Sequence, residues 1–249
     1  MVRFQIMSDL HIENFADDLN IEDFILPSAE VLILAGDIGR VHKYTQLEKF
    51  LKKLSVSFQI VLYVLGNHEY YRCDNIVPKN MEDILRDLET IKKDIHNLYI
   101  LNRNSVVIDD TCIVGCTLWS QTSINIPSFI VRIPYMNMFK YNSLFQQDLN
   151  YIENMISYCQ KKSLKLLVVT HHCPTFTVGT KRDNDKYKSL YCSSLDRLLY
   201  SSKVHTWVCG HTHKNFDVKT KNGTRLVSNQ KGKPKDNVND YSLTKIIVV

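Results

Sequence analysis

Five short stretches of the sequence carry side chains that bind divalent metals. In chain order they are Asp9-Leu10-His11, Gly36-Asp37, Gly66-Asn67-His68-Glu69, His171 and Gly210-His211-Thr212-His213. Carboxylate, amide and imidazole groups suit divalent first-row metals, and the absence of thiolates from this set argues against a structural zinc site. Seven candidate ligands are too many for one ion. They could serve two ions about 3.5–4 Å apart if one carboxylate is shared between them.

Each stretch alone is weak evidence. The tetrapeptide Gly66-Asn67-His68-Glu69 could equally be a glycine turn whose polar side chains face water. A single histidine is more often a hydrogen-bonded core or surface residue than a ligand. The metal hypothesis therefore depends on whether the fold brings the five stretches to one place.

The segments before these stretches predict that it does. Apolar runs typical of buried strands come before them: Arg3 to Met7, Val31 to Ala35, Ile60 to Leu65, Leu164 to Val169, and Thr206 to Cys209. Apolar residues at helical spacing predict helices over Tyr44 to Leu54, Asn80 to Ile95, and Leu144 to Lys162. Asp9, Asp37 and Asn67 are 28 and 30 residues apart, about one βαβ unit each. In such α/β sheets, ligands bind at the carboxyl ends of the strands.

The composition limits which class of protein this chain can belong to. The 249 residues are 44% apolar and 23% charged, which is ordinary for a globular chain, and no linker divides them, so we predict one domain spanning 1–249. The seven cysteines are irregularly spaced and form no C-x-x-C pair, which favours a reducing compartment. No apolar run approaches the ~20 residues of a membrane span, and strand-like sequence begins at once. We therefore expect a soluble, cytoplasmic protein.

Together the five stretches resemble the calcineurin-like metallophosphoesterase superfamily, in its order and with every motif present. Three further stretches resemble a branch of small, poorly characterised members: Gly115-Cys116-Thr117-Leu118-Trp119, Tyr191-Cys192-Ser193-Ser194-Leu195, and Arg225-Leu226-Val227-Ser228-Asn229. The resemblance implies a four-layer α/β/β/α sandwich with two mixed sheets flanked by helices. It also implies that Asp9, His11 and His213 hold one metal. Asn67, His171 and His211 would hold the other, Asp37 would bridge the two, and His68 would lie beside the substrate.

One departure from the family concerns His68. Protein Ser/Thr phosphatases carry G-D-x-V-D-R-G, and its second aspartate pairs with the histidine of the G-N-H-E motif. Here Arg40 stands at that position, in Gly36-Asp37-Ile38-Gly39-Arg40. This argues against a protein phosphatase and leaves open what orients His68. We expect Glu69 to fix the turn rather than do chemistry, and His172 to be either a supporting or a purely structural residue.

These observations predict a phosphoesterase with two divalent ions, drawn from Mn, Fe, Zn, Ni or Co. A hydroxide between the ions would attack phosphorus directly, and His68 would stabilise charge or protonate the leaving oxygen. Small phosphodiesters are the predicted substrates, because only Arg40 brings an arginine near the metal motifs and a monoester dianion needs more positive charge. Arg225 and Lys231 are candidate substrate contacts. We expect residues 120–142 to cap the site, and Asn229 to Asp240 to form a basic unstructured loop.

Two alternatives come from other functional classes. A nuclease would use the basic C-terminal third, but the run from Lys219 to Lys235 contains no aromatic residue to interleave with its charges. A non-catalytic scaffold on the same fold would be expected to have lost ligands, and none is missing. We therefore predict a small phosphorylated substrate as the partner, with nucleic acid less favoured and with no membrane or protein partner.

Overall fold

The chain is described by a computed structural model covering residues 1–74, 76–179, 186–201 and 203–249. The first sheet has the order β11-β1-β2-β3-β4, in which β1 to β4 run parallel and β11 is antiparallel. Its strands are β1 (Arg3–Met7), β2 (Val31–Ala35), β3 (Ile60–Val64), β4 (Leu98–Leu101) and β11 (Ile246–Val248). Two helices connect the parallel strands, α1 (Tyr44–Ser57) and α2 (Met81–Lys93).

The second sheet has the order β5-β6-β7-β8-β10-β9, with a parallel centre and an antiparallel strand at each edge. Its strands are β5 (Asn104–Ile108), β6 (Thr111–Cys116), β7 (Lys165–Thr170), β8 (Thr206–Val208), β9 (Asp217–Lys219) and β10 (Arg225–Val227). The helices of this half are α3 (Met138–Lys162) and the short α4 (Phe176–Gly179) and α5 (Asp196–Leu199).

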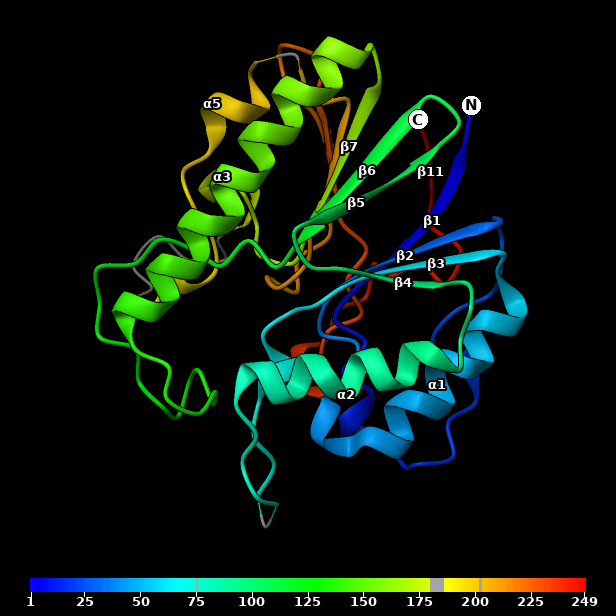
Figure 1. Ribbon diagram of the computed structural model, residues 1–249, viewed down its shortest axis with the longest axis vertical. Coiled ribbons are helices and arrows are strands. Elements are labelled where there is room, and N and C mark those ends of the chain that lie inside the picture. The colour runs from blue at the N-terminus through cyan, green and yellow to red at the C-terminus, as the bar shows by residue number, and fades with distance from the viewer. Residues whose placement is uncertain (75, 180–185, 202) are drawn as a thin grey trace.

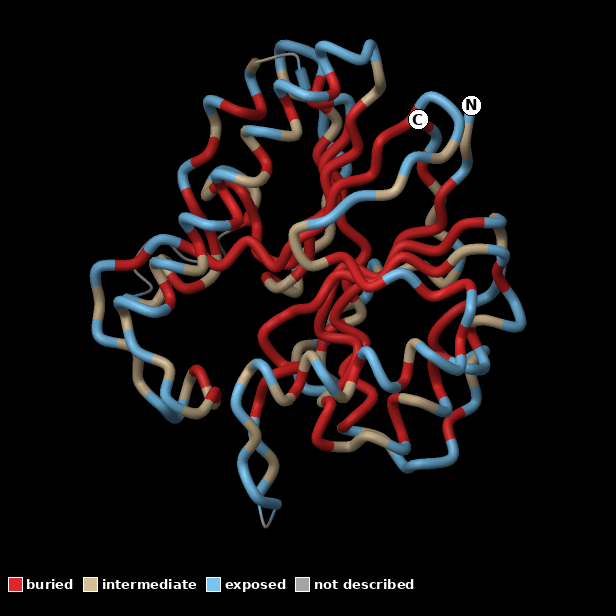
Figure 2. The backbone as a smooth tube through the Cα atoms, viewed as in Figure 1, coloured by how far each residue is buried: buried red, intermediate tan, exposed pale blue. Residues whose placement is uncertain are grey.

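The two sheets face each other, with α1 and α2 outside the first and α3 and α5 outside the second (Figure 1). Side-chain alternation explains these layers, because successive residues of a strand point to opposite faces. In β3, Leu62 and Val64 join a core cluster shared with β7 residues of the other sheet, whereas Val61 and Tyr63 pack in the cluster that contains the α1 residues. The predicted four-layer α/β/β/α sandwich is thus confirmed. The parallel strands of its two sheets are buried almost throughout, whereas the edge strands β5 and β9 are largely exposed (Figure 2).

The helices begin where the sequence supplies capping residues. Asn80 accepts a hydrogen bond from the backbone of Asp83 and so forms a capping box at the start of α2. Asn137 caps α3 in the same way, so this helix begins at Met138, several residues before the predicted Leu144. In the part of the chain that the structure describes, no helix is both long and apolar enough to cross a membrane.

Candidate metal centre

The seven predicted ligands meet where the parallel strands of both sheets end. Asp9, Asp37 and Asn67 follow β1, β2 and β3, while His171 follows β7 and His211 follows β8. Backbone hydrogen bonds join these turns, from Asp9 N to Gly36 O at 2.9 Å and from Gly210 N to His171 O at 2.9 Å. The edge predicted from strand spacing is therefore shared by the two sheets.

Five of these seven residues have a backbone conformation that non-glycine residues rarely adopt. Their φ angles lie between +48° and +71°, in the left-handed region, and they are Asp9, His11, Asp37, His211 and His213. Each such residue costs free energy and persists only where surrounding contacts enforce it, which is typical of functional sites. This concentration of strain at the turns indicates that the side-chain positions are held for a purpose.

The ligand atoms form two groups that share the region of one carboxylate. Asp9, His11 and His213 make one group, in which the Nε2 atoms of the two histidines are 3.0 Å apart. Asp37, His171 and His211 make the other group. Asp37 also reaches the first group, because its Oδ2 lies 3.9 Å from His11 Nε2, while its Oδ1 lies 3.2 Å from His171 Nε2. The position predicted for a bridging carboxylate is thus occupied by Asp37.

Asn67 belongs to the second group. Its Oδ1 lies 3.0 Å from His171 Nε2, and that nitrogen in turn lies 3.1 Å from Nδ1 of His211. All seven predicted ligands therefore meet in two adjacent groups, in the division that the family resemblance implies.

Each of the four histidines uses one ring nitrogen for a protein partner and turns the other toward its group. His171 Nδ1 donates to Ala35 O at 3.0 Å, and His211 Nε2 donates to Leu190 O at 3.1 Å. The other two histidines donate to carboxylates. His11 Nδ1 donates to Glu13 at 3.3 Å, and His213 Nδ1 donates to Asp236 at 2.5 Å. Such partners fix the tautomer and orient imidazoles that ligate metals. The donor set therefore fits a pair of divalent cations.

The carboxylates of the site favour positive charge on two of its histidines. Burial acts to lower the pKa of His171, but the carboxylate of Asp37 outweighs it and raises that pKa to about 9. Burial likewise opposes protonation of His213, and its hydrogen bonds to Asp236 and Asp9 raise its pKa to about 9. The carboxylates of the centre thus attract protons when no cation is present, and metal ions would compete with those protons.

Glu69 ties the turns of the first sheet together. Its Oε2 accepts hydrogen bonds from Gly66 N and Asp37 N, and its Oε1 accepts from Ile38 N and Tyr63 Oη, over distances of 2.7–3.1 Å. The side chain is fully buried. The expectation that Glu69 fixes the turn is therefore confirmed.

Two glycines allow the close approach of these turns. Gly36 has a φ of +87°, and a Cβ there would collide with the imidazole of His171. A Cβ on Gly66 would collide with the carboxylate of Asp37. Both positions require a residue without a side chain.

Glu13 is the residue that orients His68, and sequence reasoning missed it. Its Oε1 accepts from His68 Nδ1 at 2.8 Å, so one carboxylate holds both His68 and His11. Burial acts to raise the pKa of Glu13, but the hydrogen bonds from His11 and His68 lower it to about 2. Tyr71 stacks on the other side of the His68 ring, with centroids 4.4 Å apart. The only available signal was an acidic residue two positions after a predicted ligand.

Arg40 belongs to the same network. Its Nε lies 3.8 Å from Glu13 Oε1, and the residue lines the cavity above the metal centre. Glu13 thus provides the acidic partner for His68 that protein phosphatases supply from the position that Arg40 occupies here.

The predicted substrate contacts Arg225 and Lys231 lie elsewhere. Arg225 forms a two-fold ion pair with Asp217 across the β9–β10 hairpin, at 2.8 Å for each contact. Lys231 donates to Asp23 O at 3.0 Å and lies over the rings of Phe24 and Tyr241. Neither residue lines the cavity. The sequence predicted that these two residues contact the substrate, but in the structure both side chains bind other partners, away from the cavity.

A different lysine of that region reaches the site. Lys233 Nζ lies 3.2 Å from His68 Nε2, on the side of the ring opposite Glu13. It comes just before a 3-10 helix, Pro234–Asp236, which also carries the Asp236 carboxylate. The segment expected to be an unstructured loop is therefore ordered by contacts with the metal centre.

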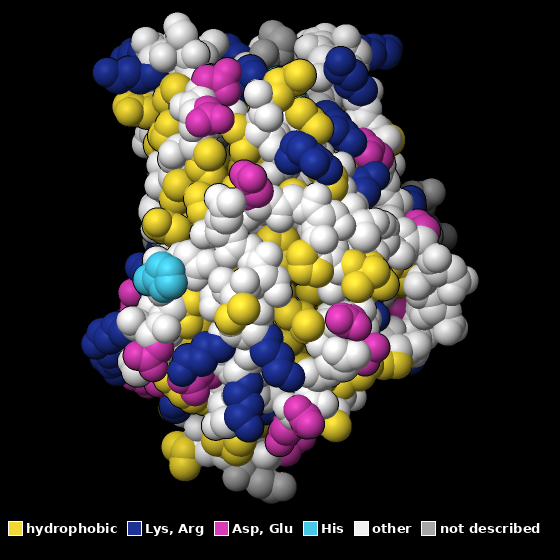
Figure 3. All heavy atoms as spheres, turned by 90° about the vertical axis from the view of Figure 1, so that its right-hand side faces the viewer, with side chains coloured by type: hydrophobic (Ala, Val, Ile, Leu, Met, Phe, Trp, Pro, Cys, Tyr) yellow, Lys and Arg dark blue, Asp and Glu magenta, His cyan; other side chains and the backbone are white. Residues whose placement is uncertain are grey.

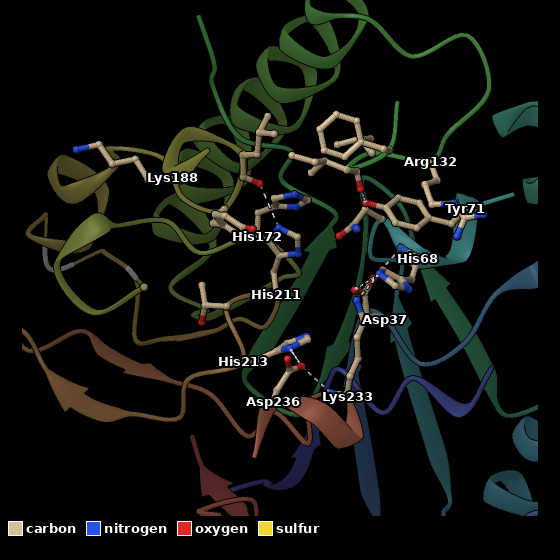
Figure 4. Close-up of a pocket in the computed structure, with 18 of the residues that line it drawn as sticks. Asp37, His68, Tyr71, Arg132, His172, Lys188, His211, His213, Lys233 and Asp236 are labelled. Carbon is tan, nitrogen blue, oxygen red and sulfur yellow. Dashed lines mark hydrogen bonds and ion pairs between the residues drawn. The ribbon is translucent and has the colours of Figure 1, made fainter. Parts of the chain in front are cut away.

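The cavity above the centre has a volume of about 540 Å³ (Figure 4). Residues 129–132 form one wall, so part of the segment expected to cap the site does lie over it. Tyr71 Oη donates to Ile130 O at 2.8 Å and holds that wall beside His68. His172 also lines the cavity, where its ring accepts or donates a hydrogen bond with Tyr141 Oη at 3.1 Å.

Comparison with known proteins agrees with this geometry. Residues 2–215 match the calcineurin-like phosphoesterase family over most of the chain. This chain belongs to that family. A curated relative, uncharacterized protein L509 of Acanthamoeba polyphaga mimivirus, is 27% identical over 275 residues, covering 96% of this chain and 95% of that protein.

Solved structures share the fold at low sequence identity. The phosphopantetheinyl hydrolase of Mycobacterium tuberculosis superimposes with a TM-score of 0.77 at 14% identity, covering 98% of this chain and 95% of that one. A dimetal phosphatase from Danio rerio gives a TM-score of 0.55 at 14% identity, covering 91% of this chain and 86% of that one. Both solved structures share the fold over nearly the whole length of this metallophosphoesterase.

Proposed function

We propose that this metallophosphoesterase hydrolyses small phosphate diesters with the help of two divalent ions. The observation that carries the proposal is the pair of buried ligand groups with Asp37 between them. Two ions bound there would lower the pKa of a water molecule and neutralise the phosphoryl oxygens of the substrate. A protein catalyses phosphoryl transfer almost entirely by positioning the reacting groups and by stabilising the charge of the transition state.

The remaining roles belong to residues beside the ligands. His68 projects Nε2 toward the cavity, while Glu13 holds its Nδ1 and Tyr71 fixes the plane of the ring. When the ring is protonated on both nitrogens, this geometry lets His68 Nε2 donate to an ester oxygen that faces the cavity. His68 also falls within ligand distance of His11 and Asp37, but the ammonium of Lys233 faces its Nε2. A cation bound to that nitrogen would be repelled by the ammonium, so we assign His68 to the substrate rather than to a metal.

The proposed preference for diesters now depends on space as well as on charge. The sequence brought no arginine near the metal motifs except Arg40, and the structure adds the ammonium of Lys233 there, which weakens the argument from charge alone. A cavity of about 540 Å³ has room for two ester groups, and its lining includes the apolar residues Phe129, Ile130 and Val131. A diester also carries a single negative charge, which two cations suffice to neutralise.

The test compares kcat/KM for bis-p-nitrophenyl phosphate and p-nitrophenyl phosphate with Mn at neutral pH. The proposal expects both activities to require metal and the diester to be the better substrate. A clear preference for the monoester would overturn the diester assignment and leave the phosphoesterase assignment intact. Absence of metal-dependent hydrolysis of any phosphate ester would overturn both.

The nuclease alternative gains little support from the surface. Several basic residues of the C-terminal third are engaged with carboxylates or with backbone, as Arg225 and Lys245 are with Asp217. Basic and acidic side chains are interspersed over the face shown in Figure 3. A phosphate-backbone binder requires a continuous basic stripe. A salt-dependent nucleic-acid shift assay should accordingly show no tight binding.

A further inference from the structure

Lys233 lines the cavity, and its ammonium group faces a histidine ring instead of a carboxylate. In the part of the chain that the structure describes, it forms no ion pair, and Nζ lies 3.2 Å from His68 Nε2. By contrast, Arg132 pairs with Asp74 and Arg40 approaches Glu13. Figure 4 shows the Lys233 side chain rising from below the cavity toward His68 and Asp37. A partly buried ammonium whose nearest partner is a ring nitrogen, and not a carboxylate, can exchange that partner for a substrate oxygen.

The backbone around Lys233 is held rigidly to the metal centre. Lys231 N donates to Ser8 O at 3.1 Å, and Gly232 N donates to Asp9 O at 3.0 Å. Lys233 N donates to Asp236 Oδ2 at 2.9 Å, the same oxygen that holds His213 Nδ1. Gly232 has a φ of +72°, which turns the chain between these contacts. The backbone of Lys233 is thus held in place before any substrate binds, which favours electrostatic stabilisation by its side chain.

The two groups at this position point to the same substrate atom. His68 Nε2 and Lys233 Nζ face one another, so an oxygen that displaces this contact would touch both. In hydrolysis water loses a proton and its oxygen forms a bond to phosphorus. The ester P–O bond breaks, its electron pair stays on the leaving oxygen, and that oxygen afterwards takes up a proton from His68 or from solvent. Negative charge therefore develops on that oxygen in the transition state. An ammonium beside it would stabilise that charge without itself losing a proton.

We propose that Lys233 donates a hydrogen bond to the leaving-group oxygen and, with His68, makes the enzyme competent toward esters of poor leaving groups. The inference rests on the proposed phosphodiesterase function and adds a residue that the metal motifs do not contain. Lys233 is then a catalytic residue supplied by the C-terminal segment, 165 positions after His68.

The experiment measures kcat/KM for a series of aryl phosphodiesters whose leaving groups range from p-nitrophenyl to phenyl. Lys233→Met keeps the length of the side chain and removes its charge. We expect a loss of about tenfold with p-nitrophenyl that rises to about 10²–10³-fold with phenyl, the range for removing one preorganised donor. Lys233→Arg should recover part of the loss with phenyl. Lys221→Met, an exposed lysine in the turn between β9 and β10, is the matched control and should behave as wild type.

Three results would overturn the inference. The first is an equal loss for all leaving groups, which would place Lys233 on a non-bridging oxygen or in substrate binding. The second is loss of bound metal from Lys233→Met by elemental analysis, which would make the residue structural. The third is activity equal to wild type. With any of these three results, the proposed phosphodiesterase function still holds as long as the wild-type protein hydrolyses the diesters. A wild-type protein that is inactive toward every ester would overturn both the proposed function and the role of Lys233.

Discussion

The Glu13→Gln substitution tests how the site holds its imidazoles. Glu13 is almost fully buried, and Oε1 accepts from His68 Nδ1 at 2.8 Å and from His11 Nδ1 at 3.3 Å. A glutamine keeps a carbonyl oxygen that can accept from both imidazoles, but it is neutral, so the hydrogen bond loses its charge assistance. A hydrogen bond to a charged group contributes about 1.5–3 kcal/mol and is roughly twice as strong as a neutral one. If His68 makes this bond in the transition state, about half of that free energy is lost and kcat/KM should fall about 3- to 12-fold.

The assay is hydrolysis of bis-p-nitrophenyl phosphate at saturating Mn, with metal content measured on the same samples. Saturating metal is required because residues that orient ligating histidines also tune metal affinity, about 10- to 100-fold on mutation. Glu22→Gln, an exposed glutamate in the same N-terminal segment, is the control and should match wild type. Activity of Glu13→Gln within twofold of wild type, at equal metal content, would refute the role of Glu13 in orienting His68.

Three further substitutions separate chemistry, metal binding and architecture. His68→Ala should lower turnover by about 10²–10⁴-fold while metal content stays near wild type, and parallel loss of metal would show that His68 is a ligand. Asp37→Asn should be the most damaging ligand change, because Asp37 lies within reach of both groups, and elemental analysis should show that both ions bind more weakly. An Asp37→Asn protein that retains both ions at wild-type affinity would contradict the bridging position. Glu69→Gln should reduce the free energy of unfolding by about 2–4 kcal/mol, since two of its four backbone and hydroxyl donors lose their acceptor. Denaturant titration measures this, and an unchanged midpoint would show that the turn does not depend on Glu69.

The seven candidate ligands could be found from the sequence because each follows a strand that can be recognised by its run of apolar residues. Asp37 after Val31–Ala35 and His171 after Lys165–Thr170 need only the rule that parallel strands end at one edge. The division into two groups came from family resemblance, and the structure brings together the same residues. Local patterns thus suffice for the ligands, whereas the four-layer arrangement of the fold came from the family resemblance.

The supporting residues could not be found in this way, because their roles depend on contacts distant in sequence. Lys233 reaches His68 only because Gly232 and Asp236 fold their segment against Asp9 and His213. Arg225 was a reasonable candidate by charge, but pairing of β9 with β10 places Asp217 beside it. No spacing rule distinguishes a lysine that faces a cavity from one that lies over aromatic rings.

The stoichiometry of bound metal tests the central claim most directly. Protein stripped with a chelator, reloaded with Mn and freed of excess ion should contain two ions per chain by elemental analysis, and activity should rise with the occupancy of the second site. The convergence of two ligand groups on Asp37 predicts this ratio. Full activity at a saturating ratio of one ion per chain would contradict the account.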